Sequence, residues 1–349
     1  MRPGLRPSGQ LSPAPRNPFL PVARHLSKLF TRRRTLKSHE YFDKPITVEE
    51  EAYGRSSAMV ILSELLNHCD HSNAGSPSQN KTAGIDFVRH LEREAKTWST
   101  FFRQSFFEAY LGAMKSVKAV KTFPQQERLL EHEGDVGDLV LSNVLAPILA
   151  ILKKLIAPDM EEYLDIYIQH QASKTLRRFV RSKDGKMEEQ TVVIYIDHAI
   201  VLVNKRCTME DRRAKLDRVY LAIVDEKRAG FVRSGHWETP SWITSDNTVK
   251  HLNQILLYAW QFECPYVLLT DYVSGVALHV LPRHDRQRPD PPRFDVASNP
   301  YPTFKESQQL VKTPNPMDGG LRHGICILAV HAMHELRVLN YDLFPTLEV

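Results

Sequence analysis

The sequence is poor in cysteine, and its four cysteines lie far apart. Cys69, Cys207, Cys264 and Cys326 form no CxxC pair, so we expect neither a zinc cage nor a disulfide framework. This usage indicates a reducing, intracellular compartment. The chain also lacks a GxxxxGK(S/T) phosphate loop, a GxSxG nucleophile elbow and the glycine loop, HRD and DFG motifs of kinases. Nucleotide-driven enzymes and serine hydrolases are therefore disfavoured.

Long hydrophobic runs are scarce as well. The most apolar stretch, residues 141–157, is interrupted by Pro147 and two lysines, so we predict a core helix and no membrane association. With 349 residues, 42% of them hydrophobic and 25% charged, the chain is long enough for one large domain or two ordinary ones.

Acidic residues are missing from the first 39 positions, which contain nine Lys and Arg residues. The remainder then has 37 positive residues against 41 acids, so the overall charge of +5 comes from this segment. We predict a basic, disordered amino-terminal segment at 1–45. Three interpretations of this segment remain open: a solvated tail, a nuclear-import or phosphate-binding patch at TRRRTLK, and a mitochondrial presequence. The prolines up to Pro21 disfavour a presequence helix, so the nucleus is preferred over the mitochondrion.

The first half of the chain is predicted to be helical. Apolar residues recur at helical spacing, and the aromatic residues from Phe87 to Tyr110 form a stripe typical of a core. The helices expected here are 46–69, 85–120, 125–133 and 135–157. We assign 46–125 to a helical region and 126–349 to an α/β core.

The second half changes to a period of two. The runs TLRRFVR and QTVVIYI flank a turn at Asp184-Gly185, and VYLAIVDEK, PYVLLTDY and GVALHVL are further strands around the helix TVKHLNQILLYAWQF. This order predicts an α/β fold with a central mixed β-sheet flanked by helices. From residue 282 we expect loops, followed by a closing helix, GICILAVHAMHELRVL, that covers the core.

The candidate chemistry lies at the end of VYLAIVDEK. An acid-x-Lys triplet occurs three times, but only Asp225-Glu226-Lys227 ends an apolar strand. The alternation of a strand places Asp225 and Lys227 on one face and Glu226 on the other. A carboxylate and a lysine about 7 Å apart along one strand can hold a divalent metal and orient the water that attacks a phosphodiester. The simpler interpretation is a strand end whose charges are solvated.

A second acid should come from a neighbouring strand. Asp217 is eight residues from Asp225 on the same strand, about 26 Å away if the strand is continuous, which is too far to share a metal. Asp197 opens IDHAIVLVN, and an antiparallel return could bring it alongside Asp225. His198, next to it, should face the other side of the sheet. His331 and His334 do not match the HExxH zinc motif, and we expect them to be structural.

An Asp that opens one strand, a D-x-K that closes the next, and a helix with Gln254-x-x-x-Tyr258 before another strand together resemble the PD-(D/E)XK nuclease superfamily, in particular its divergent eukaryotic members. The resemblance covers roughly residues 130–282. It implies a restriction-endonuclease-like core and hydrolysis of DNA or RNA that depends on Mg²⁺ or Mn²⁺. Ile196 stands where the motif has proline, and the 28-residue interval from Asp197 to Asp225 implies an insertion.

The resemblance also implies roles for individual residues. Asp197 and Asp225 would bind the metal, with the carbonyl of Glu226 completing its shell, and Lys227 would assist the attacking water. Gln254 would orient the site from its helix. An upstream acid is expected from a preceding helix, and Glu133 and Asp138 are alternatives for it.

Two other functions remain open. A catalytically silent domain of the same fold would bind nucleic acid, or a protein partner through the helical first half. A purely structural protein would have a solvated strand end at 225–227. Close approach of Asp197, Asp225 and Lys227 favours the enzyme.

Overall fold

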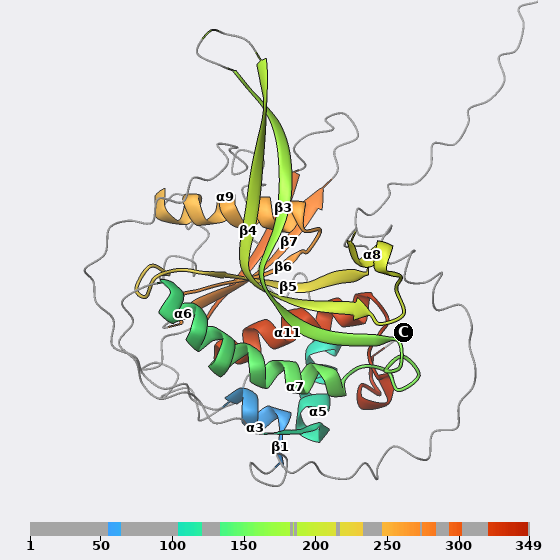
Figure 1. The fold of residues 1–349 in the computed structure, drawn as a ribbon. Helices are drawn as coiled ribbons and strands as arrows, with labels where there is room; N and C mark the ends of the chain where they lie inside the picture. The colour runs from blue at the N-terminus through green and yellow to red at the C-terminus, as the bar shows by residue number, and fades with distance from the viewer. Residues whose placement is uncertain are drawn as a thin grey trace, which may run out of the picture.

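The computed structural model describes residues 55–63, 104–120, 133–181, 184, 187–213, 217–232, 246–272, 274–283, 293–301 and 320–347. Among these residues, six strands form one mixed sheet in the order β3-β4-β5-β6-β7-β8 (Figure 1). Neighbouring strands are antiparallel except β5 and β6, which are parallel. The strands are β3 (Leu164–Arg181), β4 (Met187–Asn204), β5 (Arg218–Glu226), β6 (Tyr266–Thr270), β7 (Gly275–Arg283) and β8 (Arg293–Tyr301).

Helices cover both faces of this sheet. Helix α9 lies on one face, while α6, α7 and α11 lie on the other (Figure 1). Because β5 and β6 are parallel, the chain must cross over between them, and α9 makes that crossover. The helices are α6 (Glu133–Leu139), α7 (Ala146–Lys154), α8 (Met209–Arg213), α9 (Asp246–Gln261), α11 (Leu321–Glu335) and a 3-10 turn, η5 (Tyr341–Leu343). The predicted α/β class, with a mixed sheet flanked by helices, is confirmed at this level.

The described part of the amino-terminal region packs beneath α7. It consists of β1 (Arg55–Ser57), α3 (Ala58–Ser63), α5 (Gln104–Ser116) and β2 (Lys118–Val120), and β1 pairs with β2. Ile61 and Tyr110 belong to the same buried apolar cluster as Ile148 and Leu328. Helix was predicted throughout 46–69 and 85–120, so the strands β1 and β2 are corrections. Residues 46–54, 64–69 and 85–103 of those two ranges lie outside the described residues. So do residues 125–132 of the predicted helix 125–133 and the basic segment at 1–45.

The predicted helix 135–157 exists as α6, a π-helical segment at Val140–Leu145, and α7. Pro147 has no N–H to donate to the carbonyl of Asn143, four residues earlier. That carbonyl instead accepts a hydrogen bond from Arg322 Nε of α11 at 2.6 Å. Val136–Lys154 is the one helix within the described residues that is long and apolar enough to cross a membrane. Ile148, Ile151 and Leu152 are buried in the core, as in the core helix that we predicted.

Two parts of the sheet were not predicted from the sequence. Strand β3 begins at Leu164, well before the predicted run at 175, and β8 occupies part of the tail for which loops were predicted. Strand β8 pairs only with β7 and forms an edge of the described sheet. Proline is tolerated in edge strands, so Pro300 does not prevent a strand there.

Candidate functional site

The charged end of β5 is buried. The exposed fractions of Asp225, Glu226 and Lys227 are 0%, 4% and 3%. Charged side chains are almost never buried to this extent unless they are paired or bind a metal. The interpretation of this triplet as a solvated strand end is therefore wrong.

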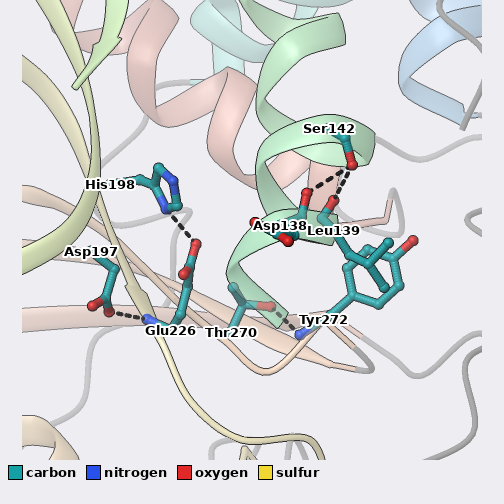
Figure 2. Close-up of polar contacts among 8 residues, drawn as sticks. All are labelled: Asp138, Leu139, Ser142, Asp197, His198, Glu226, Thr270 and Tyr272. Atoms are coloured by element: carbon teal, nitrogen blue, oxygen red, sulfur yellow. Dashed lines mark hydrogen bonds and ion pairs between the residues drawn. The ribbon is translucent and has the colours of Figure 1, made fainter. Parts of the chain in front are cut away.

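Antiparallel pairing of β4 with β5 brings Asp197 to the same place. Ala199 pairs with Ile223, and His198 pairs with Val224, so the next position outward places Asp197 opposite Asp225. Residues directly opposite on antiparallel strands share a face, with Cβ atoms about 5 Å apart. In addition, the Glu226 N–H donates a hydrogen bond to Asp197 Oδ2 at 2.8 Å (Figure 2). The expected approach of Asp197 to Asp225 is thus present. The interval between them contains the inner half of β4 and helix α8.

Lys227 lies on the same face and is paired with Asp225. Its Nζ donates to Asp225 Oδ1 at 2.8 Å, and both side chains are buried. The other carboxylate oxygen, Asp225 Oδ2, is buried and has no hydrogen-bond partner in the part of the chain that the structure describes. Burial, and the neighbouring charge of Asp225, raise the pKa of Asp197 to about 7. The site therefore contains more negative charge than Lys227 alone balances.

Helix α9 contributes a residue that sequence reasoning missed. His251 has a buried Nε2 without a hydrogen-bond partner among the described residues. Burial and the charge of Lys227 lower the pKa of His251 to about 4, against the opposing effect of Asp225, so the imidazole is neutral at pH 7. The sequence signal that could have identified His251 is its position three residues before Gln254, which places both residues on the same side of the helix. Gln254 itself donates a hydrogen bond to the Tyr258 hydroxyl along the same helix.

Glu226 and His198 lie on the opposite face of the sheet, as their alternation predicts. Glu226 Oε1 and His198 Nδ1 are 2.6 Å apart, and both side chains are buried. The His170 ring lies against that of His198, with centroids 4.2 Å apart. Figure 2 shows this pair facing helix α6, with Asp197 on the other side of the β5 chain.

Helix α6 approaches the His198–Glu226 pair through Gly137. A Cβ atom at Gly137 would lie 2.8 Å from Glu226 Oε2, whereas one at Gly134 would have nothing within 4 Å. The lack of a side chain at Gly137 therefore allows α6 to approach Glu226 closely, and the backbone of this glycine is not in the left-handed region.

The two glycines give a matched test of this packing. Gly134→Ala should stabilise the protein by about 0.5–1 kcal/mol, the usual gain from alanine in a helix. Gly137→Ala should destabilise it, because Glu226 and its partner His198 must shift within a packed interior. Urea unfolding of both variants measures the difference. Equal stabilisation by the two substitutions would contradict the close contact between α6 and β5.

Both candidates for the upstream acid lie on α6. Glu133 is the first residue of α6, and its side chain lies outside what the structure describes. Asp138 is exposed, and its charge opposes the lowering of the pKa of His170. It therefore lies on the side of the His198–Glu226 pair, away from Asp197 (Figure 2). Nothing described brings Asp138 to Asp225.

The donor set fits a partly coordinated divalent cation. In the described part of the chain, no group of three or more His, Cys, Asp or Glu side chains is arranged to hold a metal. Mg²⁺, however, commonly binds one or two carboxylates and takes its other ligands from water and substrate phosphates. Asp197 and Asp225 are two such carboxylates. Asp225 Oδ2, a buried oxygen without a hydrogen-bond partner among the described residues, could serve as one ligand, and a cation would offset the burial and the charge repulsion that raise the pKa of Asp197.

The candidates set aside from the sequence lie elsewhere. Asp217 forms an ion pair with Arg218 at 2.8 Å. His331 Nδ1 lies 2.6 Å from the Tyr266 hydroxyl, and His334 Nδ1 lies 3.2 Å from that of Tyr341. These contacts agree with structural roles.

No protein-family model matches the chain, and no curated protein matches it. Its function must therefore be inferred from the geometry of the site. Two carboxylates on one face, a buried lysine and a neutral imidazole can bind a cation, orient water and stabilise an anionic transition state.

Proposed function

We propose that the protein is a PD-(D/E)XK-like nuclease that hydrolyses phosphodiester bonds of DNA or RNA with Mg²⁺ or Mn²⁺. The observation that carries the proposal is the placement of Asp197 beside Asp225, with Lys227 bonded to Asp225 at 2.8 Å on a buried strand end. Two carboxylates and one ammonium group are held together at the junction of β4, β5 and α9. Their burial is costly, and such costs are common at functional sites.

The order of elements supports the same family. Helix α7 precedes three antiparallel strands, β3, β4 and β5, and α9 then leads to β6, which is parallel to β5. This order is the one that the resemblance implies for a restriction-endonuclease-like core. The candidate residues lie on β4, β5 and α9, the elements in which the motif expects them.

Each residue then has a defined role. Asp197 and Asp225, with the Glu226 carbonyl, would hold the cation, which polarises the phosphate and lowers the pKa of the attacking water. Lys227 Nζ, held by Asp225, donates a hydrogen bond to a non-bridging phosphate oxygen or to the water. The Glu226 N–H fixes the orientation of the Asp197 carboxylate. Neutral His251 would offer an N–H donor or an acceptor to the same space, and Gln254, about one turn further along α9, would help to orient the site from that helix.

A catalytically silent domain that binds nucleic acid or protein is the second candidate. It is favoured by the absence, among the described residues, of a three-ligand metal group. It is also favoured by the pairing of Lys227 with Asp225, which would serve a purely structural ion pair equally well.

Cleavage of labelled nucleic acid separates the two candidates. Purified protein should cleave at least one of single- or double-stranded DNA and RNA in Mg²⁺ or Mn²⁺, and both EDTA and Asp225→Ala should abolish that cleavage. Gel electrophoresis of end-labelled substrates measures it. Binding without cleavage by the intact protein would favour the silent domain, and cleavage that survives Asp225→Ala would reject the proposed site.

A further inference from the structure

The β3–β4 hairpin extends far beyond the sheet to which it belongs. Both strands have 18 residues and pair along almost their whole length. Strand β5, however, pairs with β4 only from His198 to Val203. Within the described residues, the outer part of the hairpin therefore has no third strand, and it extends away from the body past α9 (Figure 1). We call the described residues of this outer part, 171–181 and 187–196, the arm.

The two faces of the arm are different. Ala172, Ile194 and Ile196 are buried, and Lys174 Nζ lies 5.6 Å from the centre of the Phe262 ring at the end of α9. This face anchors the base of the arm on the body. On the other face, Tyr195 is 59% exposed and Val193 is 45% exposed.

The exposed pair is unusual for this chain. Within the described residues, only four large hydrophobic side chains are exposed, and Tyr195 is the one aromatic residue among them. Tyr195 and Val193 are neighbours on one face, whereas Val60 and Met209 lie on other elements. An exposed aromatic and aliphatic pair on a projecting ribbon is suited to contact with a partner.

The charge of the arm indicates the kind of partner. Residues 171–181 and 187–196 contain four Lys and Arg residues and two acids, whereas residues 40–349 as a whole contain 37 positive residues against 41 acids. The arm is thus a basic element on an acidic body. Polyanions are attracted to basic segments that carry aromatic residues, because bases stack on the aromatic rings.

The position of Tyr195 relates the arm to the candidate site. Tyr195 and Asp197 are two residues apart on β4, so they lie on one face about 7 Å apart along the strand. A base stacked on Tyr195 would lie about one nucleotide from a phosphodiester held at Asp197 and Asp225. Duplex bases are already stacked on each other, so an exposed ring of this kind suits an unpaired base.

We propose that the arm binds single-stranded nucleic acid, with Tyr195 stacking on a base next to the phosphodiester at the candidate site. This inference rests on the proposed function for its substrate class. It assigns the arm and Tyr195 a role in substrate binding, separate from the groups that perform hydrolysis.

Fluorescence anisotropy with labelled 20-nucleotide single-stranded DNA and RNA, in EDTA so that nothing is cleaved, tests the proposal. Tyr195→Ala should weaken binding about 10-fold, as expected for the loss of one base–aromatic stack, and Tyr195→Phe should keep it within about 2-fold. Met209→Ala and Val60→Ala, which also remove exposed apolar side chains, should bind as the unmodified protein does. Circular dichroism checks that all variants are folded.

The proposal is overturned if the unmodified protein binds no labelled strand, if Tyr195→Ala binds as tightly as it does, or if a matched duplex binds more tightly than the single strand. Cleavage in Mn²⁺ is scored separately. Tyr195-dependent binding without cleavage supports the role of the arm in binding and rejects the proposed nuclease activity. Cleavage together with binding that does not depend on Tyr195 supports the nuclease activity and rejects the role of the arm.

Discussion

Replacing Lys227 by methionine should lower the rate of phosphodiester hydrolysis by about 100- to 1000-fold, the usual loss when one preorganised donor to the transition state is removed. The same substitution should also destabilise the protein. Lys227 is buried and pairs with the fully buried Asp225, and leaving one member of such a pair unbalanced typically costs about 3–5 kcal/mol. Loss of activity alone would therefore not prove a catalytic role.

A double substitution separates the two effects. Asp225→Asn with Lys227→Met removes both charges of the buried pair, so the unfolding free energy should recover most of the loss while cleavage stays absent. Lys153→Met is the matched control, because Lys153 pairs with Asp165 at the surface; it should cost under about 1 kcal/mol and leave cleavage unchanged. Guanidinium unfolding and initial cleavage rates measure both properties. Full cleavage by Lys227→Met would exclude a catalytic role for this lysine.

The part of the site that the sequence predicted depends on local alternation. The apolar run before Asp225 predicted a buried strand, and its period of two separated Lys227 from Glu226. The apolar residues after Asp197 predicted a second strand, and an antiparallel return was the simplest way to bring the acids together. Such inferences need only the geometry of strands. The buried Lys227–Asp225 pair and the His198–Glu226 bond on the reverse face agree with them.

The parts that were missed depend on long-range packing. The burial of Glu226 follows from its contact with His198 and the approach of α6 at Gly137, and no local pattern contains that information. Strand β8 is defined by its pairing with β7, although its sequence contains a proline and no long apolar run. His251 is one polar residue among several on α9, and only the approach of that helix to Lys227 distinguishes it. Propensity cannot predict which of several surfaces will meet.

Asp197→Asn should make the metal-free protein more stable at pH 8, although it removes a candidate metal ligand. Folding raises the pKa of this carboxyl from 3.8 to about 7, so the folded state holds the proton more tightly than the unfolded state does. Stability is unaffected below the unfolded pKa and decreases as the pH rises from about 4 to 7, and the full penalty is present above 7. A shift of this size corresponds to at most about 4 kcal/mol. Asparagine does not ionise, and its oxygen can still accept the Glu226 N–H.

Urea unfolding in EDTA at pH 8 and pH 4.5 measures this difference, which should be large at pH 8 and small at pH 4.5. Adding Mg²⁺ or Mn²⁺ should raise the stability of the unmodified protein, by about 2.7 kcal/mol at 100 times the dissociation constant, and should have little effect on the variant.

Asp271→Asn is the control. The pKa of Asp271 is also raised by burial, to about 6, but its carboxylate accepts the N–H groups of Ser274 and Val232. Asparagine there loses an acceptor, so this variant should be destabilised and should keep the response to metal. If Asp197→Asn is no more stable than the unmodified protein at pH 8, folding does not raise the pKa of Asp197. If metal stabilises both proteins equally, Asp197 belongs to no cation site, and the silent domain becomes the better description of this fold.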